Sequence, residues 1–338
     1  MSNEFYISKY VRPFFEDYLV CRKNLSICTV RSYRDVIKMF FNFAAGQSKK
    51  TTPKLLISDV EESTVLKFLT YLEKKRRNSI QTRNHRLAML RKFYEYLSYH
   101  EPVWSEQCRK ILDIPIKRGA VDAEIYYLEK EELAAIFNAI DTKTSMGRRD
   151  YAILQFMYNS GARVQETSDL LLSWLSLEKP YKVQILGKGR KIRTCPLWKD
   201  TIEILKKIMT ERAEPIEECD HVFLNRMGNP LSRFGIWDMV AKYKTKAALQ
   251  MPSLKSKKVT PHTFRHTTAM HLLQSGVEIN VIRSWLGHAQ LITTHRYAEI
   301  DLAMKRKALK SCEIKNKHNP GSSRWRSDPD VLGWLESL

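Results

Sequence analysis

The sequence of 338 residues lacks a long apolar run. No stretch approaches the roughly 20 consecutive apolar residues that a membrane-spanning helix needs. The opening residues, MSNEFYISKY, lack the apolar segment of a secretory signal peptide. The cysteines form no Cys-x-x-Cys pair, which disfavours a disulfide framework or a zinc ribbon; they are Cys21, Cys28, Cys108, Cys195, Cys219 and Cys312. We therefore expect a cytoplasmic protein with reduced, mostly structural thiols and no membrane partner.

Acidic residues are in short supply. The chain has 37 Asp and Glu against 57 Lys and Arg, which gives a formal net charge of +20. Clustered cations gain free energy by displacing counterions from phosphates, so this excess favours nucleic acid, and more weakly an anionic membrane surface. Residues 1–118 hold 23 basic and 12 acidic residues, and the remainder hold 34 and 25. A charged tail would place the excess at one end, whereas two basic domains could close around a duplex.

The length suggests two domains, each able to bury a core. Residues 1 to about 112 show helical periodicity and no convincing strand alternation. Four helices are expected there: Tyr10–Val20, Thr29–Ala45, Ser63–Lys74 and Thr82–Tyr99. Thr29 suits an N-cap and Gly46 a helix stop. Pro115 and Gly119 break the periodicity, which predicts a linker at Asp113–Ala123.

The second half mixes helices with a short β-rich stretch. Helices are predicted at Glu129–Ile140 and Arg149–Asn159, and a β-hairpin at Tyr181–Leu197 around the basic turn GKGRK. Helices resume at Asp200, where Glu203 would complete a capping box. We divide the chain into a helical domain at 1–118, a mixed domain at 119–315 and a polar tail at 316–338, with no internal repeat.

The segment TPHTFRHTTAMHLLQSG is the most informative. Thr260 fits an N-cap, Pro261 the first helical position and Gly276 the residue just past the end. His262 and Arg265 then share one face of the first turn, near the positive end of the helix dipole. An imidazole and a guanidinium there can receive a phosphate. The alternative is a surface arginine beside structurally satisfied histidines.

A zinc site on the same helix is a weaker interpretation. His262 and His266 lie four residues apart and could share a metal. A zincin needs a glutamate after the first histidine, but Thr263 stands there, so metal binding is disfavoured.

The segment SGARVQETSDL carries a weaker signal. Gly161 can end a helix in the left-handed conformation, and Arg163 opens the next helix with Glu166 one turn later. Taken alone, this pattern is usually a solvated ion pair.

The segment SWLGHAQLITTHRYAE predicts a helix that ends at Gly287, with His288 directly after it. A new helix, beginning near Thr293 or Thr294, carries Tyr297. A single tyrosine on a helix belongs more often to a core than to a reaction.

Together these signals are far more specific. Gly-x-Arg, a GKG hairpin, His-x-x-Arg-His, Leu-Gly-His and Thr-Thr-x-x-Tyr follow one another, and this order resembles the tyrosine recombinase, or phage integrase, family over nearly the whole chain. TVRSYRDVIKMFFNF and TRNHRLAMLRKFYEYL resemble the second and fourth helices of that family's core-binding domain. The resemblance implies a mainly α fold with a small β-sheet: an all-helical, SAM-like core-binding domain followed by a mixed α/β catalytic domain.

The resemblance assigns roles to the motif residues. Tyr297 is implied to be the nucleophile, and Arg163 and Arg265 to clamp the scissile phosphate of DNA. Glu166 matches the acidic residue that supports the first arginine. Two arginines can offset the charge of a pentacoordinate phosphorus without a metal, so no cofactor is expected.

Proton transfer is implied to fall to Lys188 and His262, with His288 donating a hydrogen bond to the phosphate. Tyrosine has a reference pKa of about 10 and needs a base or a cationic site before it attacks, and His262 is the candidate base. Lys188 is the candidate acid for the departing 5′ oxygen. Its neighbours in the hairpin are predicted to make nonspecific phosphate contacts: Arg190, Lys191 and Arg193.

The resemblance implies a site-specific recombinase that cuts and rejoins double-stranded DNA through a 3′-phosphotyrosyl intermediate. A homo-tetramer would act on two specific recombination sites, with room for accessory proteins. The helix Asp301–Ser311 would dock on a neighbouring subunit. No arm-binding domain precedes Tyr10, so we expect a compact chromosomal, plasmid or transposon recombinase performing integration, excision, transposition or resolution.

Three alternatives stay open at this point. A type IB topoisomerase would use the same chemistry as a monomer and relax supercoils without exchange between sites. A catalytically silent DNA-binding protein would bind without cutting. A zinc hydrolase on His262 and His266 would lose activity on chelation.

Overall fold

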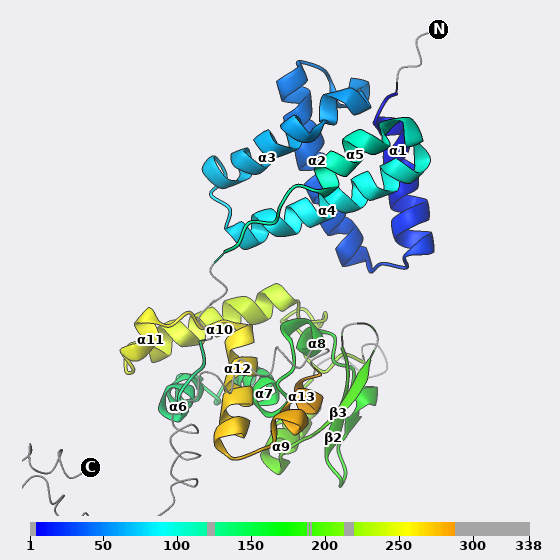
Figure 1. The fold of residues 1–338 in the computed structure, drawn as a ribbon. Coiled ribbons are helices and arrows are strands. Elements are labelled where there is room, and N and C mark those ends of the chain that lie inside the picture. The colour runs from blue at the N-terminus through cyan, green and yellow to red at the C-terminus, as the bar shows by residue number, and fades with distance from the viewer. Residues whose placement is uncertain (1–4, 120–125, 188, 190, 213–219, 288–338) are drawn as a thin grey trace, which may run out of the picture. The chain divides into compact units, whose positions relative to one another are not determined.

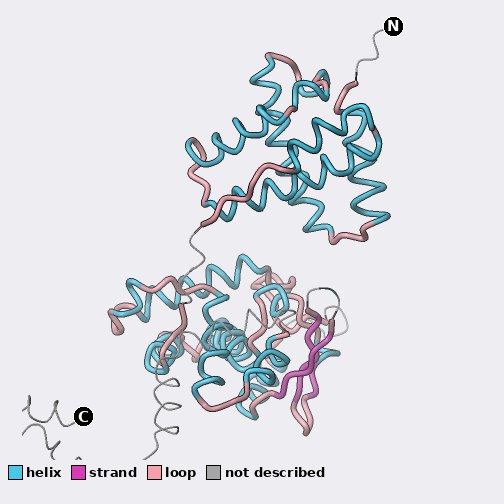
Figure 2. Tube along the Cα trace, viewed as in Figure 1, coloured by secondary structure: helices cyan, strands magenta, loops and turns pink. Residues whose placement is uncertain are grey.

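The computed structural model describes residues 5–119, 126–187, 189, 191–212 and 220–287. The chain divides into two compact units, Met1–Ala123 and Glu124–Leu338 (Figure 1). Most described residues are helical, and a small three-stranded sheet lies in the second unit (Figure 2). The predicted fold class, mainly α with a small β-sheet, is confirmed.

The first unit is a helical bundle around an aromatic core. Its fully buried rings include Phe14, Phe40, Phe68 and Phe93. The ring centroids of Phe14 and Phe93 lie 5.1 Å apart and those of Phe40 and Phe68 lie 5.3 Å apart, both with edge-to-face geometry. Its elements are α1 (Ser8–Pro13), the π-helix η1 (Phe14–Arg22), α2 (Ile27–Ser48), the 3-10 turns η2 (Thr52–Lys54) and η3 (Ile57–Val60), α3 (Glu62–Lys74), α4 (Ile80–His100), the 3-10 turn η4 (Pro102–Trp104) and α5 (Ser105–Leu112).

The four predicted helical segments of this unit are present, but the ends of α2 differ from the prediction. The side chain of Ser26 accepts the backbone N–H of Thr29 at 3.3 Å, so Ser26 and not Thr29 is the N-cap. Gly46 lies inside the helix, which ends at Lys49 in the left-handed conformation. A glycine in a helix costs only about 1 kcal/mol, which the burial of the preceding turn outweighs. The short helix α5 was not predicted.

The second unit packs helices around a central α7. Helices α9 and α12 both pack along α7, and α13 packs on α12. This arrangement brings the start of α12 and the ends of α7 and α13 close together. Its elements are α6 (Lys130–Asn138), α7 (Ser145–Ser160), α8 (Val164–Ser168), the 3-10 turn η5 (Leu172–Trp174), β1 (Leu175–Ser176), β2 (Lys182–Leu186), β3 (Ile192–Pro196), α9 (Lys199–Thr210), α10 (Arg233–Ala247), α11 (Ser253–Ser256), α12 (Pro261–Gln274) and α13 (Ile279–Leu286).

The sheet has the order β1-β2-β3 with antiparallel pairing, and β2 and β3 form the predicted hairpin. Leu186 pairs with Ile192 at the turn end of the hairpin. Burial alternates along both strands, as expected for a sheet with one covered face. Val183 and Ile185 therefore face inward, and so do their partners on β3, which include Arg193.

Helix α9 begins with a cap from another helix. The predicted capping box of Asp200 and Glu203 is wrong: α9 starts after Trp198 and has no side-chain cap of its own. The buried Oδ1 of Asn159, near the end of α7, accepts the Trp198 N–H at 2.8 Å and the Thr201 hydroxyl at 3.0 Å. A tertiary contact thus supplies the acceptor that the local sequence was expected to provide.

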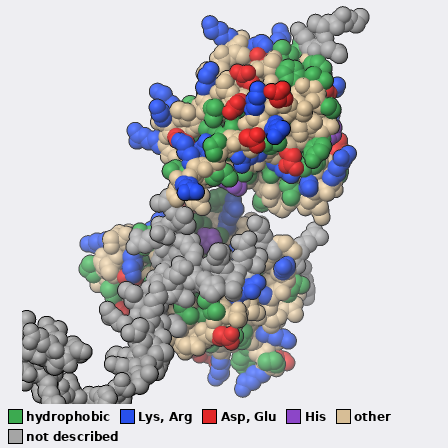
Figure 3. All heavy atoms as spheres, in the orientation of Figure 1, with side chains coloured by type: hydrophobic (Ala, Val, Ile, Leu, Met, Phe, Trp, Pro, Cys, Tyr) green, Lys and Arg blue, Asp and Glu red, His purple; other side chains and the backbone are tan. Residues whose placement is uncertain are grey.

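The described surface carries mixed charge. In Figure 3, Lys and Arg side chains lie among Asp and Glu across the visible face of the first unit. Exposed ion pairs account for some of them, such as Arg12 with Glu16 at 2.9 Å. Within the described residues, no helix combines the length and apolar character needed to cross a membrane.

Candidate active site

Three of the six predicted catalytic residues lie in the described part of the chain: Arg163, His262 and Arg265. The other three, Lys188, His288 and Tyr297, lie outside the described residues. The helix predicted to carry Tyr297 also lies outside them. The described residues therefore hold one half of the predicted site and the segments that lead to the other half.

Gly161 ends α7 in the left-handed conformation, as predicted, with φ +62°. The chain then turns so that Arg163 becomes the N-cap of α8. Glu166, one turn into α8, accepts the Arg163 backbone N–H at 2.8 Å and its Nη1 at 2.7 Å. The carboxylate thus orients both the main chain and the side chain of Arg163. The Arg163 side chain remains 31% exposed and can reach a ligand.

Helix α12 starts as its sequence predicts. Thr260 is the N-cap, Pro261 the first helical residue, and Gly276 follows the end with φ +84°. The side chain of Thr263 accepts the Thr260 N–H at 2.9 Å, which closes the first turn. The turn that carries His262 and Arg265 is therefore well anchored.

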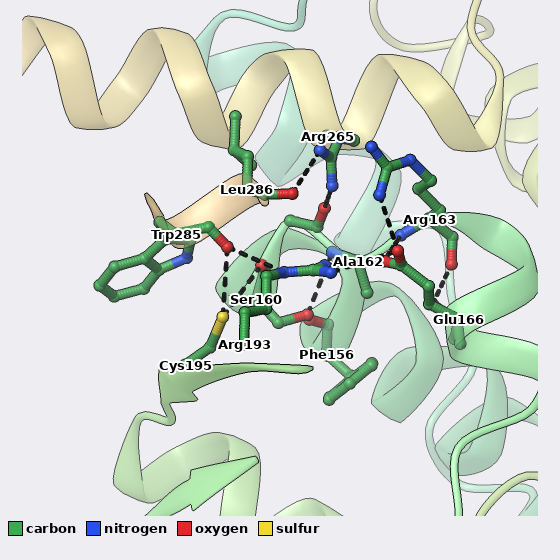
Figure 4. Close-up of polar contacts among 12 residues, drawn as sticks. Phe156, Ser160, Ala162, Arg163, Glu166, Arg193, Cys195, Arg265, Trp285 and Leu286 are labelled. Atoms are coloured by element: carbon green, nitrogen blue, oxygen red, sulfur yellow. Dashed lines mark hydrogen bonds and ion pairs between the residues drawn. The ribbon is translucent and has the colours of Figure 1, made fainter. Parts of the chain in front are cut away.

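Arg265 joins three segments of the second unit. Its Nη1 donates to the Gly161 carbonyl at 2.7 Å and its Nη2 to the Leu286 carbonyl at 2.5 Å. The side chain is 3% exposed. The start of α12, the Gly161 turn that leads to Arg163, and the end of α13 consequently meet at one guanidinium (Figure 4).

His262 has an environment suited to a general base. Its side chain reaches the surface, but the protein packed around the ring desolvates it. This desolvation, followed by the positive charges of Arg265 and Arg163, lowers the pKa of His262 below its ordinary 6.5, against a smaller opposing effect of Glu166. The neutral, proton-accepting form therefore predominates at pH 7.

The zinc alternative gains no support from the described residues. The rings of His262 and His266 lie 6.3 Å apart, centroid to centroid, in a nearly parallel arrangement. In the part of the chain that the structure describes, no three His, Cys, Asp or Glu side chains lie together in a way that could hold a metal ion.

Two predicted residues outside the described set follow well-placed neighbours. Helix α13 ends at Gly287 in the left-handed conformation, as predicted, and His288 comes next in the chain. In the hairpin, Gly187 donates its N–H to the Lys191 carbonyl at 2.8 Å, and Lys188 falls inside this turn. A Cβ atom placed on Gly187 would lie 3.7 Å from Oε1 of Glu166, and the carbonyl of Leu286, the residue before Gly287, accepts Nη2 of Arg265.

Arg193 was predicted to contact DNA phosphates, and this prediction is wrong. Its side chain is 8% exposed and lies on the inner face of β3. Nη2 and Nη1 donate to the two carboxylate oxygens of Glu166, at 2.7 and 3.2 Å. Strict alternation along β3 could have revealed this, because it places Arg193 on the same face as buried Cys195.

Glu166 is consequently shared by two arginines (Figure 4). Burial of the carboxylate raises its pKa, but the hydrogen bonds and charge of Arg193, followed by the hydrogen bonds of Arg163, outweigh this effect. Together they lower the pKa of Glu166 to about 2. The carboxylate is therefore ionised at neutral pH and balances part of a strongly cationic site.

Comparison with known proteins gives this site its context. Residues 126–304 match the phage integrase family, and residues 14–100 match the phage integrase N-terminal SAM-like domain. The Sinorhizobium fredii protein y4rC, named provisionally as an integrase/recombinase, is 33% identical over the whole of both chains. Tyrosine recombinase XerC of Anoxybacillus flavithermus is 30% identical over 85% of this chain and 91% of its own.

Solved structures agree on the fold. The Tn1549 transposon integrase in complex with transposon right end DNA superposes with a TM-score of 0.67 at 16% identity, covering 88% of this chain and 97% of that one. XerH site-specific recombinase bound to its difH substrate, post-cleavage, gives 0.66 at 22% identity, covering 86% and 82%. The chain belongs to the phage integrase family: it is a tyrosine recombinase.

Proposed function

We propose that this recombinase cuts and rejoins double-stranded DNA at specific sites, with Tyr297 as the nucleophile. The observation that carries the proposal is the meeting of the Arg163 and Arg265 segments beside His262, whose pKa is lowered. Two permanent cations next to a neutral imidazole suit attack on a phosphodiester. The DNA complexes among the solved relatives support a duplex as the partner.

The proposed cleavage step is a transesterification. The Tyr297 oxygen attacks the scissile phosphorus and its proton passes to His262, while the bond from phosphorus to the 5′ oxygen breaks. Lys188 gives a proton to that oxygen, and His288 donates a hydrogen bond to the phosphate. The product is a 3′-phosphotyrosyl ester and a free 5′ hydroxyl. Because the ester conserves the bond energy, a 5′ hydroxyl of another strand can reverse the step without ATP.

The two arginines carry the electrostatic part of the reaction. Attack adds negative charge to the phosphate oxygens, and a guanidinium offers charged, bidentate donors to them. Arg163 keeps part of its side chain exposed while Glu166 orients it. Arg265 is held by two backbone carbonyls, which fixes its position without cancelling its charge.

The larger assembly is part of the proposal. Residues 1–118 would be the core-binding domain, 119–315 the catalytic domain and 316–338 a tail. A tetramer in the cytoplasm would exchange strands between two sites in pairs through a Holliday junction, and the segment Asp301–Ser311 would dock on a neighbouring subunit. Integration, excision, transposition and resolution would all use this same chemistry.

A strand-exchange assay tests the function. The probe is a duplex whose binding sequence is selected from a randomised library with the Tyr297→Phe variant, which needs no chemistry to bind. Two such duplexes of different length should yield recombinants of predicted length with the wild-type protein and none with the variant. Relaxation of a supercoiled plasmid without recombinants would instead support a topoisomerase, and binding without cleavage would support a silent DNA-binding protein.

A further inference from the structure

Arg193 ties together the parts of the molecule that carry the proposed catalytic residues. Its Nη1 and Nη2 donate to Glu166 on α8, and its Nε donates to the Trp285 carbonyl at 3.0 Å, near the end of α13. It lies on β3, whose turn to β2 contains Lys188. One side chain thus links the hairpin, the partner of Arg163 and the end of α13.

The contact with α13 is close. A Cβ atom placed on Gly287 would lie 3.0 Å from Cδ of Arg193, so the arginine stem passes directly beside this left-handed residue. Gly287 precedes His288, and the Leu286 carbonyl beside it accepts Nη2 of Arg265. The guanidinium of Arg193 therefore contacts the partner of Arg163, and its aliphatic stem contacts the segment that holds Arg265 and precedes His288.

Charge gives Arg193 a second effect. The buried Glu166 carboxylate accepts bonds from both arginines, so the three groups carry a net charge of +1. Without Arg193, the carboxylate would face Arg163 alone, and the pair would be neutral. The field that Arg163 offers to a phosphate would then be largely cancelled, in a partly buried site where charges interact strongly.

We propose that Arg193 is a positioning residue for strand cleavage, a proposal that rests on the proposed function. It neutralises Glu166 so that Arg163 retains its positive charge for the phosphate, and it holds the end of α13 that positions Arg265. Because Nη1 and Nη2 both pair with the Glu166 carboxylate and Nε donates to the Trp285 carbonyl, Arg193 acts through these neighbours and not by touching DNA.

The main test replaces Arg193 with Met and measures single-turnover cleavage of a nicked duplex that carries the selected binding sequence. Removing a group that orients a functional residue typically costs 10- to 100-fold, as in the outer shell of metal sites. We expect a loss of about that size with DNA affinity within about threefold of wild type, because Arg193 does not face the surface. Cleavage by folded Arg193→Met at the wild-type rate would overturn the proposal.

Arg149 provides a matched control in the same unit. Its guanidinium likewise pairs with a buried carboxylate, that of Asp150 at 2.6 Å, and donates to a backbone carbonyl, that of Leu224 at 3.1 Å. It lies eleven residues before Ser160, about 16 Å along α7 from the end that leads to the site. Arg149→Met should lose stability and keep its cleavage rate. An equal rate loss in both variants would reduce Arg193 to a structural role.

A neutral phosphate separates charge from structure. If Arg193 preserves the charge of Arg163, its removal should matter less when a methylphosphonate replaces the scissile phosphate, because less negative charge then needs to be offset. We expect the ratio of wild-type to Arg193→Met rates to fall at least fivefold on this substrate. An unchanged ratio contradicts the electrostatic part of the proposal.

Two further measurements keep the test decisive. If Arg193→Met does not fold, Arg193→Lys keeps the charge but cannot bridge Glu166 and the Trp285 carbonyl with a planar fork. It should cleave about tenfold more slowly than wild type, and an undiminished rate contradicts the part of the proposal in which Arg193 holds the end of α13. Failure of the proposed function is distinguishable, because wild-type protein would then form no covalent adduct or Tyr297→Phe would still form one.

Discussion

Gly161 is the position where a single added methyl group should perturb the site most clearly. Its φ of +62° places it in the left-handed region, and a Cβ there would lie 2.5 Å from Cδ2 of Leu286. The left-handed conformation costs a non-glycine residue about 1–2 kcal/mol. Overpacking a well-filled site costs a further 1–3 kcal/mol. Gly161→Ala should therefore reduce the free energy of unfolding by about 2–5 kcal/mol.

Gly276 separates these two contributions. It has φ +84°, and a Cβ there would meet no atom within 4 Å. Gly276→Ala should therefore show the conformational cost alone, about 1–2 kcal/mol. Urea denaturation of both full-length variants under identical conditions measures the difference, since the first unit contributes equally to each. Equal losses of stability would contradict this prediction, because they would mean that the contact with Leu286 relaxes without cost.

The same substitution should reach the chemistry. The Gly161 carbonyl accepts Nη1 of Arg265 at 2.7 Å, so a shift of the turn moves the guanidinium. Cleavage by the folded fraction of Gly161→Ala should fall, whereas Gly276→Ala should cleave normally, since no described contact links that residue to the arginines.

Further predictions concern titration and capping. Because the pKa of Glu166 is lowered to about 2, its charge stabilises the fold above pH 4.5, and this contribution fades as the pH falls toward 2. The difference in free energy of unfolding between wild type and Glu166→Gln should therefore narrow over that range in urea titrations. A constant difference would contradict the lowered pKa of Glu166. The base form of His262 should be required for cleavage, so cleavage rates should fall in acid below its lowered pKa. Arg163→Gln removes a cation that lowers this pKa, so it should move the acid limb of the pH–rate profile to higher pH. An unmoved limb would mean that the charge of Arg163 does not act on His262. Asn159→Ala should lower the free energy of unfolding by about 2 kcal/mol or more, because it leaves the buried start of α9 without its hydrogen-bond acceptor. Ser232→Ala removes an exposed cap and should lower it by about 1 kcal/mol, and thermal unfolding can measure both losses.

Local signals predicted much of the backbone structure around the candidate site. Gly161, Gly276 and Gly287 each follow a helix in the left-handed conformation, as their positions in the sequence indicated. Pro261 opens α12, and the strands on either side of the GKGRK turn form the hairpin. These features depend on residues within one or two helical turns of each other, so the local sequence is enough to predict them.

Predictions failed where contacts between residues far apart in the sequence determine the local structure. The start of α9 could not be placed at Trp198, because its acceptor comes from Asn159 on α7. The sequence alone does not distinguish Arg193 from the other cations beside the basic turn. Its burial depends on pairing with Glu166, 27 positions earlier in the chain. A buried arginine is stable only with such a partner, and tertiary packing supplies it.

The proposed function is tested most directly by asking whether Tyr297 becomes covalently joined to DNA. A nicked duplex releases the short strand after cleavage and so traps the ester, which can be digested and mapped by mass spectrometry. We predict a nucleotide attached through phosphate to the peptide that contains Tyr297, formed by wild-type protein and abolished in Tyr297→Phe while DNA binding persists. An adduct that maps to another residue, or that survives in Tyr297→Phe, would show that Tyr297 is not the nucleophile.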